Sequence, residues 1–234
     1  MENMNSWYDI DWPKVNNNVY LLQMRIFRAS KDQNWEKVFK IQKLFIRSAS
    51  AKYLAVRKVM QDNNGKTTLE IDDKTNVSKK ERFELFQNLF LKRNGPVLQK
   101  VKILKKDEVL KPLETFTMGD RALQTLALMA LSPQWEAHFE PSSYGFRPGR
   151  SVFDAMEAVF LSIYKKQKWV LNADISKCFE RINHEVLIKK CNTFPEMEKQ
   201  IKVWLQAGIL EREHLTRSLE ETLKKSPMVS LLVN

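Results

Sequence analysis

One aspartate stands where a metal-binding carboxylate could stand. Asp174 follows residues 169–173, and across 169–175 apolar residues occupy every second position, the period of a half-buried strand. A carboxylate at the end of a buried strand can hold a hard cation such as Mg²⁺, which takes one or two carboxylates together with substrate phosphates. Polymerases use such ions to clamp the attacking and leaving oxygens. Alone the signal is weak, because an aspartate after a strand is more often a turn or cap residue.

The residues after Asp174 predict a tight turn and then a helix. Phe179 lies within the turn, five positions after the aspartate. Asn183 is a suitable N-cap and Glu185 falls in the first helical turn, ahead of the apolar residues 186–188.

A second stretch with phosphate chemistry covers residues 143–151, which read Ser-Tyr-Gly-Phe-Arg-Pro-Gly-Arg-Ser. Two of the six glycines of the chain lie here, which indicates unusual backbone dihedrals or a close approach. Arg147 and Arg150 supply the charge and fork geometry that suit phosphate groups. The alternative is a glycine-proline turn with solvated arginines.

The intervening segments predict the elements that would position these residues. Apolar runs at 98–104 and 109–116 flank a charged tip and predict a β-hairpin. Thr117 and Asp120 predict a capped helix, and Pro133 is expected to restart a second one at its first position. Ser151 should cap a further helix, whose expected core face is listed here: Phe153, Met156, Phe160 and Ile163.

The first sixty residues predict three helices with basic outer faces. Tyr20, Leu21, Met24 and Phe27 are expected to share the apolar face of the first. A solvated basic face is the usual meaning of such a charge run, but one sign recurs over three helices with few acids between, which favours a contact with RNA. The predicted RNA-binding residues are Arg25, Arg28, Lys37, Lys40, Lys43, Arg47, Arg57 and Lys58.

Composition supports a polyanionic partner. The 234 residues are 43% hydrophobic and carry a formal net charge of +11, and phosphate neutralisation dominates nucleic-acid affinity. A basic ribosome-like or membrane-surface protein is the alternative. Cys178 and Cys191 lack metal-ligand spacing and are expected to be reduced core residues. No stretch has the roughly 18 apolar residues of a membrane span, and we expect an intracellular protein without a signal peptide.

Two of these stretches resemble conserved blocks of one family. Residues 143–151 resemble the second block, and residues 169–184 the third block, of the group II intron reverse transcriptases, the maturase family. Residues 7–12, which read Trp-Tyr-Asp-Ile-Asp-Trp, are similar to the N-terminal extension that binds intron RNA in that family. The resemblance implies an α+β fold, with a helical extension over 1–75, a fingers-like region over 76–168 and an incomplete palm over 169–234.

The resemblance also implies roles for individual residues. Asp174 would be a vestigial catalytic residue and the metal ligand, with Phe179 discriminating the sugar of the nucleotide. Lys105, Lys111, Arg147 and Arg150 would bind the nucleotide. Lys111 stands where the family has arginine and loses the bidentate fork, and Glu114 would bring a negative charge close to the triphosphate.

The Tyr-Ala-Asp-Asp block of active family members does not occur in this sequence, and residues 226–234 resemble a degraded fourth block. We therefore expect a maturase-like protein that binds group II intron RNA, a truncated reverse transcriptase that is inactive alone. Mg²⁺ would be a cofactor only if activity survives. The alternatives are one half of a split RNA-directed DNA polymerase, completed by a second polypeptide carrying the rest of the palm, or a decayed reading frame. An organelle (plastid or mitochondrion) or a bacterial cytoplasm would suit the family.

Overall fold

The computed structural model describes most of the chain. The residues it describes are 7–60, 79–91, 97–103, 111–115, 117–165, 167–176, 182–206, 208–211 and 214–217. Side chains are described for all of these except Lys79 and the residues of the strands.

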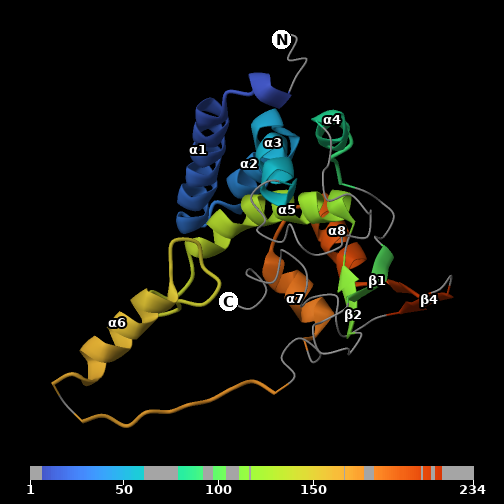
Figure 1. The fold of residues 1–234 in the computed structure, drawn as a ribbon. Coiled ribbons are helices and arrows are strands. Elements are labelled where there is room, and N and C mark those ends of the chain that lie inside the picture. Colours follow the sequence, from blue (N-terminus) through green and yellow to red (C-terminus); the bar gives the residue numbers. More distant parts are fainter. Residues whose placement is uncertain are drawn as a thin grey trace.

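The described chain is built around helices (Figure 1). Their bounds in chain order are η1 Trp7–Asp9, α1 Trp12–Lys31, α2 Trp35–Arg47, α3 Ala49–Met60, α4 Lys79–Gln87, α5 Met118–Glu136, α6 Val152–Ile163, α7 His184–Cys191 and α8 Pro195–Leu205. No helix in the described ranges combines the length and the apolar character that crossing a membrane would need.

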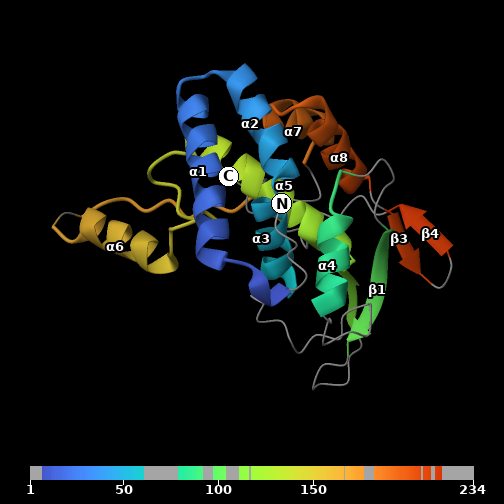
Figure 2. The same cartoon turned by 90° about the horizontal axis from the view of Figure 1, so that it is seen from above.

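Helix α5 is the centre of the core and lies across α1, α2 and α3 (Figures 1 and 2). It begins at the predicted cap, where the side chain of Thr117 accepts a hydrogen bond from the backbone N–H of Asp120. Leu123, Leu126 and Leu131 are almost fully buried along it. The core is therefore a helical one, assembled by packing three N-terminal helices against α5.

The predicted helix restart at Pro133 is wrong, because α5 continues through this proline to Glu136. A proline inside a helix removes the N–H that would bond the carbonyl four residues earlier. That carbonyl belongs to Met129, and it accepts a hydrogen bond of 2.9 Å from Nε2 of Gln23 instead. A side chain of α1 thus satisfies the acceptor that Pro133 leaves without its helical partner.

A buried polar network joins the helices of the core to the α7–α8 pair. Gln42 of α2 and Gln134 of α5 are 0% and 1% exposed, and Nε2 of Gln42 donates to Oε1 of Gln134 over 2.6 Å. Nε2 of Gln134 in turn donates to the carbonyls of Cys191 and Asn192, and Oγ1 of Thr193 donates to Gln42. The end of α7 is therefore fixed to the core by amide hydrogen bonds.

A four-stranded sheet lies at one side of the helices (Figure 2). Its strands are β1 Val97–Ile103, β2 Lys111–Thr115, β3 Gly208–Glu211 and β4 His214–Arg217, in the order β2-β1-β3-β4. The antiparallel β1–β2 pair, in which Ile103 faces Lys111, is the hairpin that the sequence predicted. Strand β3 runs parallel to β1 and antiparallel to β4.

The predicted α+β class is wrong for the part of the chain whose side chains are described. That part is 71% helical and contains no strand, and its buried core lies on helices and the short links between them. The strand expected over residues 169–175 is absent: the backbone there has no sheet partner among the described residues. Apolar residues do alternate along this segment, but a strand also needs a hydrogen-bonded neighbour, and no described residue pairs with it.

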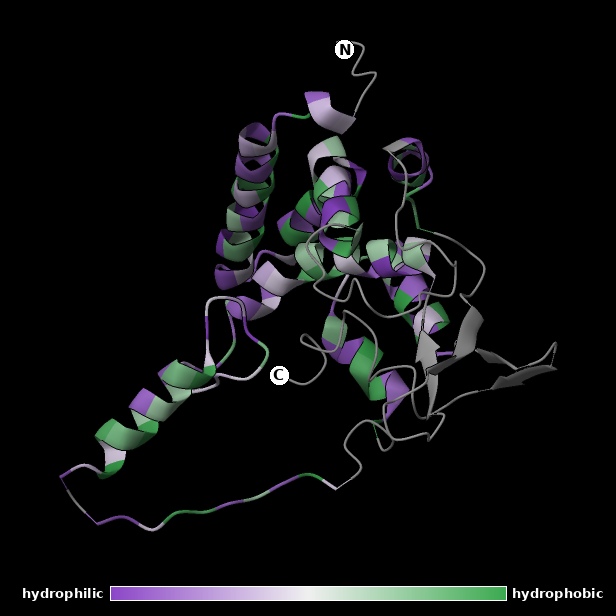
Figure 3. Ribbon diagram, in the orientation of Figure 1, coloured by the Kyte–Doolittle hydropathy of each residue, from purple (hydrophilic) through white to green (hydrophobic). Residues whose placement is uncertain are grey.

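Helix α6 also departs from the prediction. Its capping box is present, with Ser151 and Asp154 bonding each other's backbone N–H groups. The expected core face, however, is exposed, and Phe153 is 80% accessible. Figures 1 and 2 show α6 and the following segment extending away from the helical body, and Figure 3 shows the apolar residues along α6.

The apolar face predicted for α1 is rotated from the one that is buried. Tyr20 and Leu21 are exposed, whereas Val15, Val19 and Ile26 are buried. Each set of residues has the spacing of one helix face, so periodicity alone could not predict which face packs against α5.

Candidate nucleic-acid interface

Helices α1, α2 and α3 present an almost uniformly basic surface. Together they contain eleven lysines and arginines and a single acidic residue, Glu36. Because packing against α5 uses the apolar positions, the basic side chains remain near the surface. Among the eight predicted RNA-binding residues, Arg25, Arg28, Lys37, Lys40, Arg47 and Lys58 are exposed, and Lys43 and Arg57 are partly buried.

Some of these cations already have partners within the protein. Nζ of Lys40 lies 2.6 Å from Oε1 of Glu36, and this hydrogen bond lowers the pKa of the Glu36 carboxyl. The guanidinium of Arg57 lies over the ring of Trp12, 4.5 Å from its centre. Lys40 and Arg57 are therefore engaged locally, whereas the structure shows no ion pair for Arg25, Arg28 or Lys37 with any described residue.

Lys43 and Arg47 lie elsewhere, in a groove of about 890 Å³ between α2, α3, the end of α4 and α8. Nζ of Lys43 lies 3.3 Å from Oε2 of Glu196 and 5.5 Å from the ring centre of Phe194. The predicted basic residues thus form two groups: an outer surface and a groove wall.

Four residues of this groove that could contact a ligand were not predicted from the sequence: Lys52, Phe90, Lys199 and Lys202. Lys199 and Lys202 lie on α8, more than 150 positions along the chain from Lys43, and nothing in the local pattern of α8 connects them with α2. The sequence of α8 shows only lysines on the polar side of an amphipathic helix, and many helices have that pattern without a binding site.

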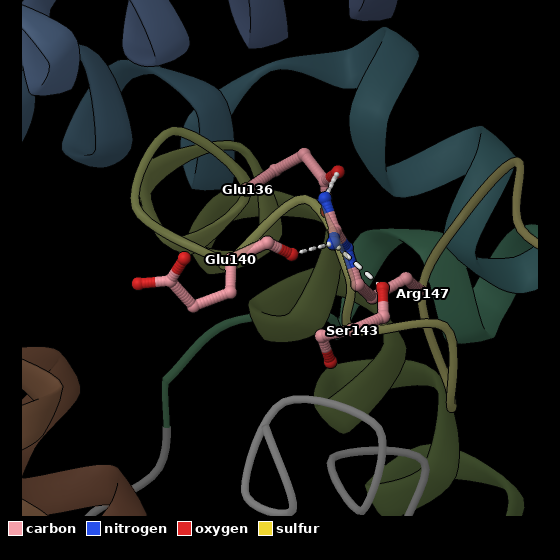
Figure 4. A network of polar contacts seen from close by, with 4 residues as sticks. All are labelled: Glu136, Glu140, Ser143 and Arg147. Atoms are coloured by element: carbon pink, nitrogen blue, oxygen red, sulfur yellow. Dashed lines mark hydrogen bonds and ion pairs between the residues drawn. The ribbon is translucent and has the colours of Figure 1, made fainter. Parts of the chain in front are cut away.

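The loop after α5 is organised by Arg147, which is only 8% exposed (Figure 4). Its Nη2 lies 2.6 Å from Oε1 of Glu136, and its Nε donates to the other carboxylate oxygen over 3.3 Å. Its Nη1 donates to the carbonyls of Glu140 and Ser143, each over 2.7 Å. The guanidinium also lies 5.4 Å from the ring centre of Phe139. This fork is directed into the protein, where it ties the loop to the end of α5.

Arg150 has a different environment although it belongs to the same motif. It is exposed, and its guanidinium lies 5.5 Å from the ring centre of Tyr144. The backbone between the two arginines turns through Gly149, whose φ of +72° is one that side-chain-bearing residues rarely adopt. Arg150 is therefore open to an anionic ligand in a way that Arg147 is not.

Asp174 is exposed, and one of its oxygens accepts a 2.9 Å hydrogen bond from the N–H of Ile175. Its neighbours are open to solvent too, and Trp169 is completely exposed. Among the described residues no three His, Cys, Asp or Glu side chains come together as metal ligands would. The role of Asp174 as a Mg²⁺ ligand stays a prediction, and no catalytic step follows from the described residues.

Three of the predicted nucleotide-site residues cannot be placed. Lys105 and Phe179 lie outside the described residues, and only the backbone of Lys111, in β2, is described. Of the two cysteines, Cys191 is a free, buried thiol, as predicted, and Cys178 lies outside the described ranges. Whether the predicted nucleotide-binding residues come together therefore lies outside the described residues, and their role stays a prediction.

The sequence matches two models of known families. Residues 7–89 match the N-terminal domain of reverse transcriptase, and residues 103–227 match reverse transcriptase (RNA-dependent DNA polymerase). Because the second match covers more than half of the chain, the chain belongs to the reverse transcriptase family. Its relatives identify it further as a member of the group II intron reverse transcriptase and maturase group.

Three relatives show how far the similarity to known proteins extends. Maturase-like protein 1 of Euglena gracilis is 30% identical over 76% of this chain and 41% of its own length. The group II intron-encoded protein LtrA of Lactococcus lactis subsp. cremoris is 26% identical over 88% of this chain and 36% of its own. Protein YkfC of Escherichia coli K12 is 38% identical over 39% of this chain and 25% of its own. The chain thus spans less than half the length of these relatives, and the resemblance predicted from the two motifs is confirmed.

Proposed function

We propose that this chain binds group II intron RNA as a maturase-like protein, and that the outer surface of α1–α3 carries the contact. The observation behind the proposal is the charge of these helices, eleven basic residues against one acidic residue. Non-specific RNA affinity depends on neutralising phosphates, and exposed cations without protein partners are available for that. An intracellular location, in an organelle or a bacterial cytoplasm, would accompany this function.

The test removes four exposed charges from this surface. A variant with Arg25→Gln, Arg28→Gln, Lys37→Gln and Lys58→Gln should bind a structured intron RNA more weakly than the unmodified chain. Its affinity should also depend less on salt, with the log–log slope reduced by about 0.7–0.9 for each phosphate that the variant no longer neutralises. Affinity is measured by filter binding across a salt series.

The matched control replaces four exposed lysines elsewhere, Lys165, Lys168, Lys189 and Lys190, by glutamine. Both variants lose the same net charge, so a general electrostatic effect would weaken both equally. Equal losses would contradict the assignment of the RNA contact to α1–α3.

A second candidate function is one half of a split RNA-directed DNA polymerase. The observation that favours it is the exposure of the segment that should carry the catalytic aspartate: Trp169, Leu171 and Ile175 are apolar and largely accessible. A second polypeptide carrying the rest of the palm would cover them and supply further carboxylates, and Mg²⁺ would then be the cofactor.

Primer extension on an RNA template in the presence of Mg²⁺ tests this candidate. The chain alone should give no product. Product that forms when a polypeptide with the Tyr-Ala-Asp-Asp block is added, and that is lost with Asp174→Ala, would support the split enzyme. The same mixture without product would leave RNA binding as the function.

A further inference from the structure

The groove between α2, α3 and α8 has a charge that its own acidic residues do not balance. Its lining includes five basic residues, Lys43, Arg47, Lys52, Lys199 and Lys202, and one acidic residue, Glu196. Lys43 pairs with Glu196 over 3.3 Å, and Lys202 pairs with Glu198 over 2.8 Å.

The other three cations, Arg47, Lys52 and Lys199, form no ion pair with any residue in the described parts of the chain. They come from α2, α3 and α8, so only the folded chain brings them to one groove. Partial burial lowers the pKa of the Lys52 ammonium, because the charge loses part of its hydration there. An anionic ligand bound in the groove would give the partly buried Lys52 ammonium a partner of opposite charge.

An exposed aromatic ring accompanies these charges. Phe90, just after the end of α4, lines the groove and is 56% accessible, whereas its neighbour Leu89 is 2% accessible and belongs to the core. Phe194 lies beneath Lys43 and is buried, so Phe90 is the aromatic side chain of the described lining that a ligand can reach.

Positive charge beside an accessible aromatic ring is the combination that single-stranded nucleic acids use: the cations follow the phosphates and a base stacks on the ring. A duplex keeps its bases stacked on each other and would leave Phe90 without a partner. An acidic peptide would satisfy the lysines, but its carboxylates would not stack on the ring.

We propose that this groove binds single-stranded RNA, with phosphates on Arg47, Lys52 and Lys199 and a base stacked on Phe90. The proposal extends the proposed function, because it adds a second site and specifies an unpaired RNA segment as its ligand. The outer surface of α1–α3 would then hold structured RNA while the groove takes a strand.

The experiment uses the full chain and a short oligouridine with one 2-aminopurine, whose fluorescence falls when the base stacks. Phe90→Leu should lower the affinity about fivefold or more and abolish the quenching, while Phe90→Trp should retain both. Lys52→Gln with Lys199→Gln should reduce the salt slope by about 1.4, which is 0.7 for each phosphate. Lys189→Gln with Lys190→Gln, two exposed positions on α7, is the charge-matched control.

Unchanged oligouridine affinity in the Lys52/Lys199 variant would overturn the proposal, as would quenching that persists in Phe90→Leu. Competition by oligoglutamate as strong as that by unlabelled RNA would overturn it in favour of an acidic protein partner. Thermal unfolding of each variant establishes that a loss of binding is not a loss of fold.

The outcome is independent of the outer surface. The variant with Arg25, Arg28, Lys37 and Lys58 replaced should still bind oligouridine. If the unmodified chain binds oligouridine through Phe90 but does not bind structured intron RNA, the proposed function fails and the groove stands. The reverse result refutes the groove alone.

Discussion

Replacing Arg147 by alanine should destabilise the chain rather than remove a nucleotide contact. The guanidinium is buried and makes two bonds to the Glu136 carboxylate and two to backbone carbonyls. Arg147→Ala leaves the carboxylate and both carbonyls without this donor. Removing one partner of a buried ion pair costs about 3–5 kcal/mol. The Glu136 side chain is 31% accessible, so water can solvate it in part, and we expect the lower end, about 3 kcal/mol.

Arg147→Lys separates charge from geometry. Lysine keeps the positive charge but has no planar fork, so a single ammonium cannot reach the carboxylate and both carbonyls at once. We expect a loss of about 1.5–3 kcal/mol, the value of one hydrogen bond to a charged group. The order of stability should therefore be arginine, lysine, alanine.

Urea unfolding with linear extrapolation measures these free energies. The control is Arg150→Ala. It removes an exposed arginine of the same motif, whose guanidinium lies over the ring of Tyr144. It should cost about 1 kcal/mol or less. If Arg147→Ala left the free energy of unfolding within about 0.5 kcal/mol of the unmodified chain, the reasoning from Figure 4 would be wrong.

Two further predictions concern the core. Gln134→Leu should lower the free energy of unfolding by about 1–3 kcal/mol, because it removes one hydrogen-bond partner from the buried Gln42 amide and the donor to the carbonyls of Cys191 and Asn192. The double variant with Gln42→Leu should cost less than the sum of the single ones. Simple additivity in urea unfolding would contradict this coupling. Burial raises the pKa of the Cys191 thiol to about 11. The stabilisation linked to this shift is complete below the ordinary thiol pKa of about 9 and is lost as the pH rises through 11. In a Cys178→Ser background the folded chain should therefore resist alkylation at pH 8, and rapid labelling without unfolding would refute this.

Local features of the fold could be predicted from the sequence because they depend on neighbours in the chain. The helix caps are the clearest case: the side chains of Thr117, Ser151 and Asn183 each accept a hydrogen bond from a backbone N–H two or three positions ahead. The β1–β2 hairpin is local in the same sense. These elements need no distant partner, so a short window of sequence contains the whole interaction.

Burial could not be predicted in the same way, since it depends on what else packs against a segment. The apolar face of α6 and the alternating residues 169–175 both have the pattern of core elements, yet both are exposed. A periodic pattern says that a segment has one face to bury and leaves open what covers that face. In α1 the buried face is therefore a different one from the predicted face. In α6 no described element covers the predicted apolar face.

The motif at residues 143–151 shows why residue type and spacing define a candidate site only in part. By residue type and spacing, Arg147 and Arg150 are equivalent predicted phosphate ligands, because both are arginines in one glycine-containing loop. In the fold, Glu136 and two carbonyls surround Arg147, while Arg150 stays accessible beside Tyr144. A ligand at Arg147 would have to replace the Glu136 ion pair, so any anion that approaches this loop should meet Arg150 first.

The groove is the opposite case, since Lys52 and Lys199 have no common motif and become neighbours only when α3 and α8 pack beside α2. The proposed groove site therefore depends on which cations the fold leaves without an ion pair, and sequence patterns alone do not reveal that.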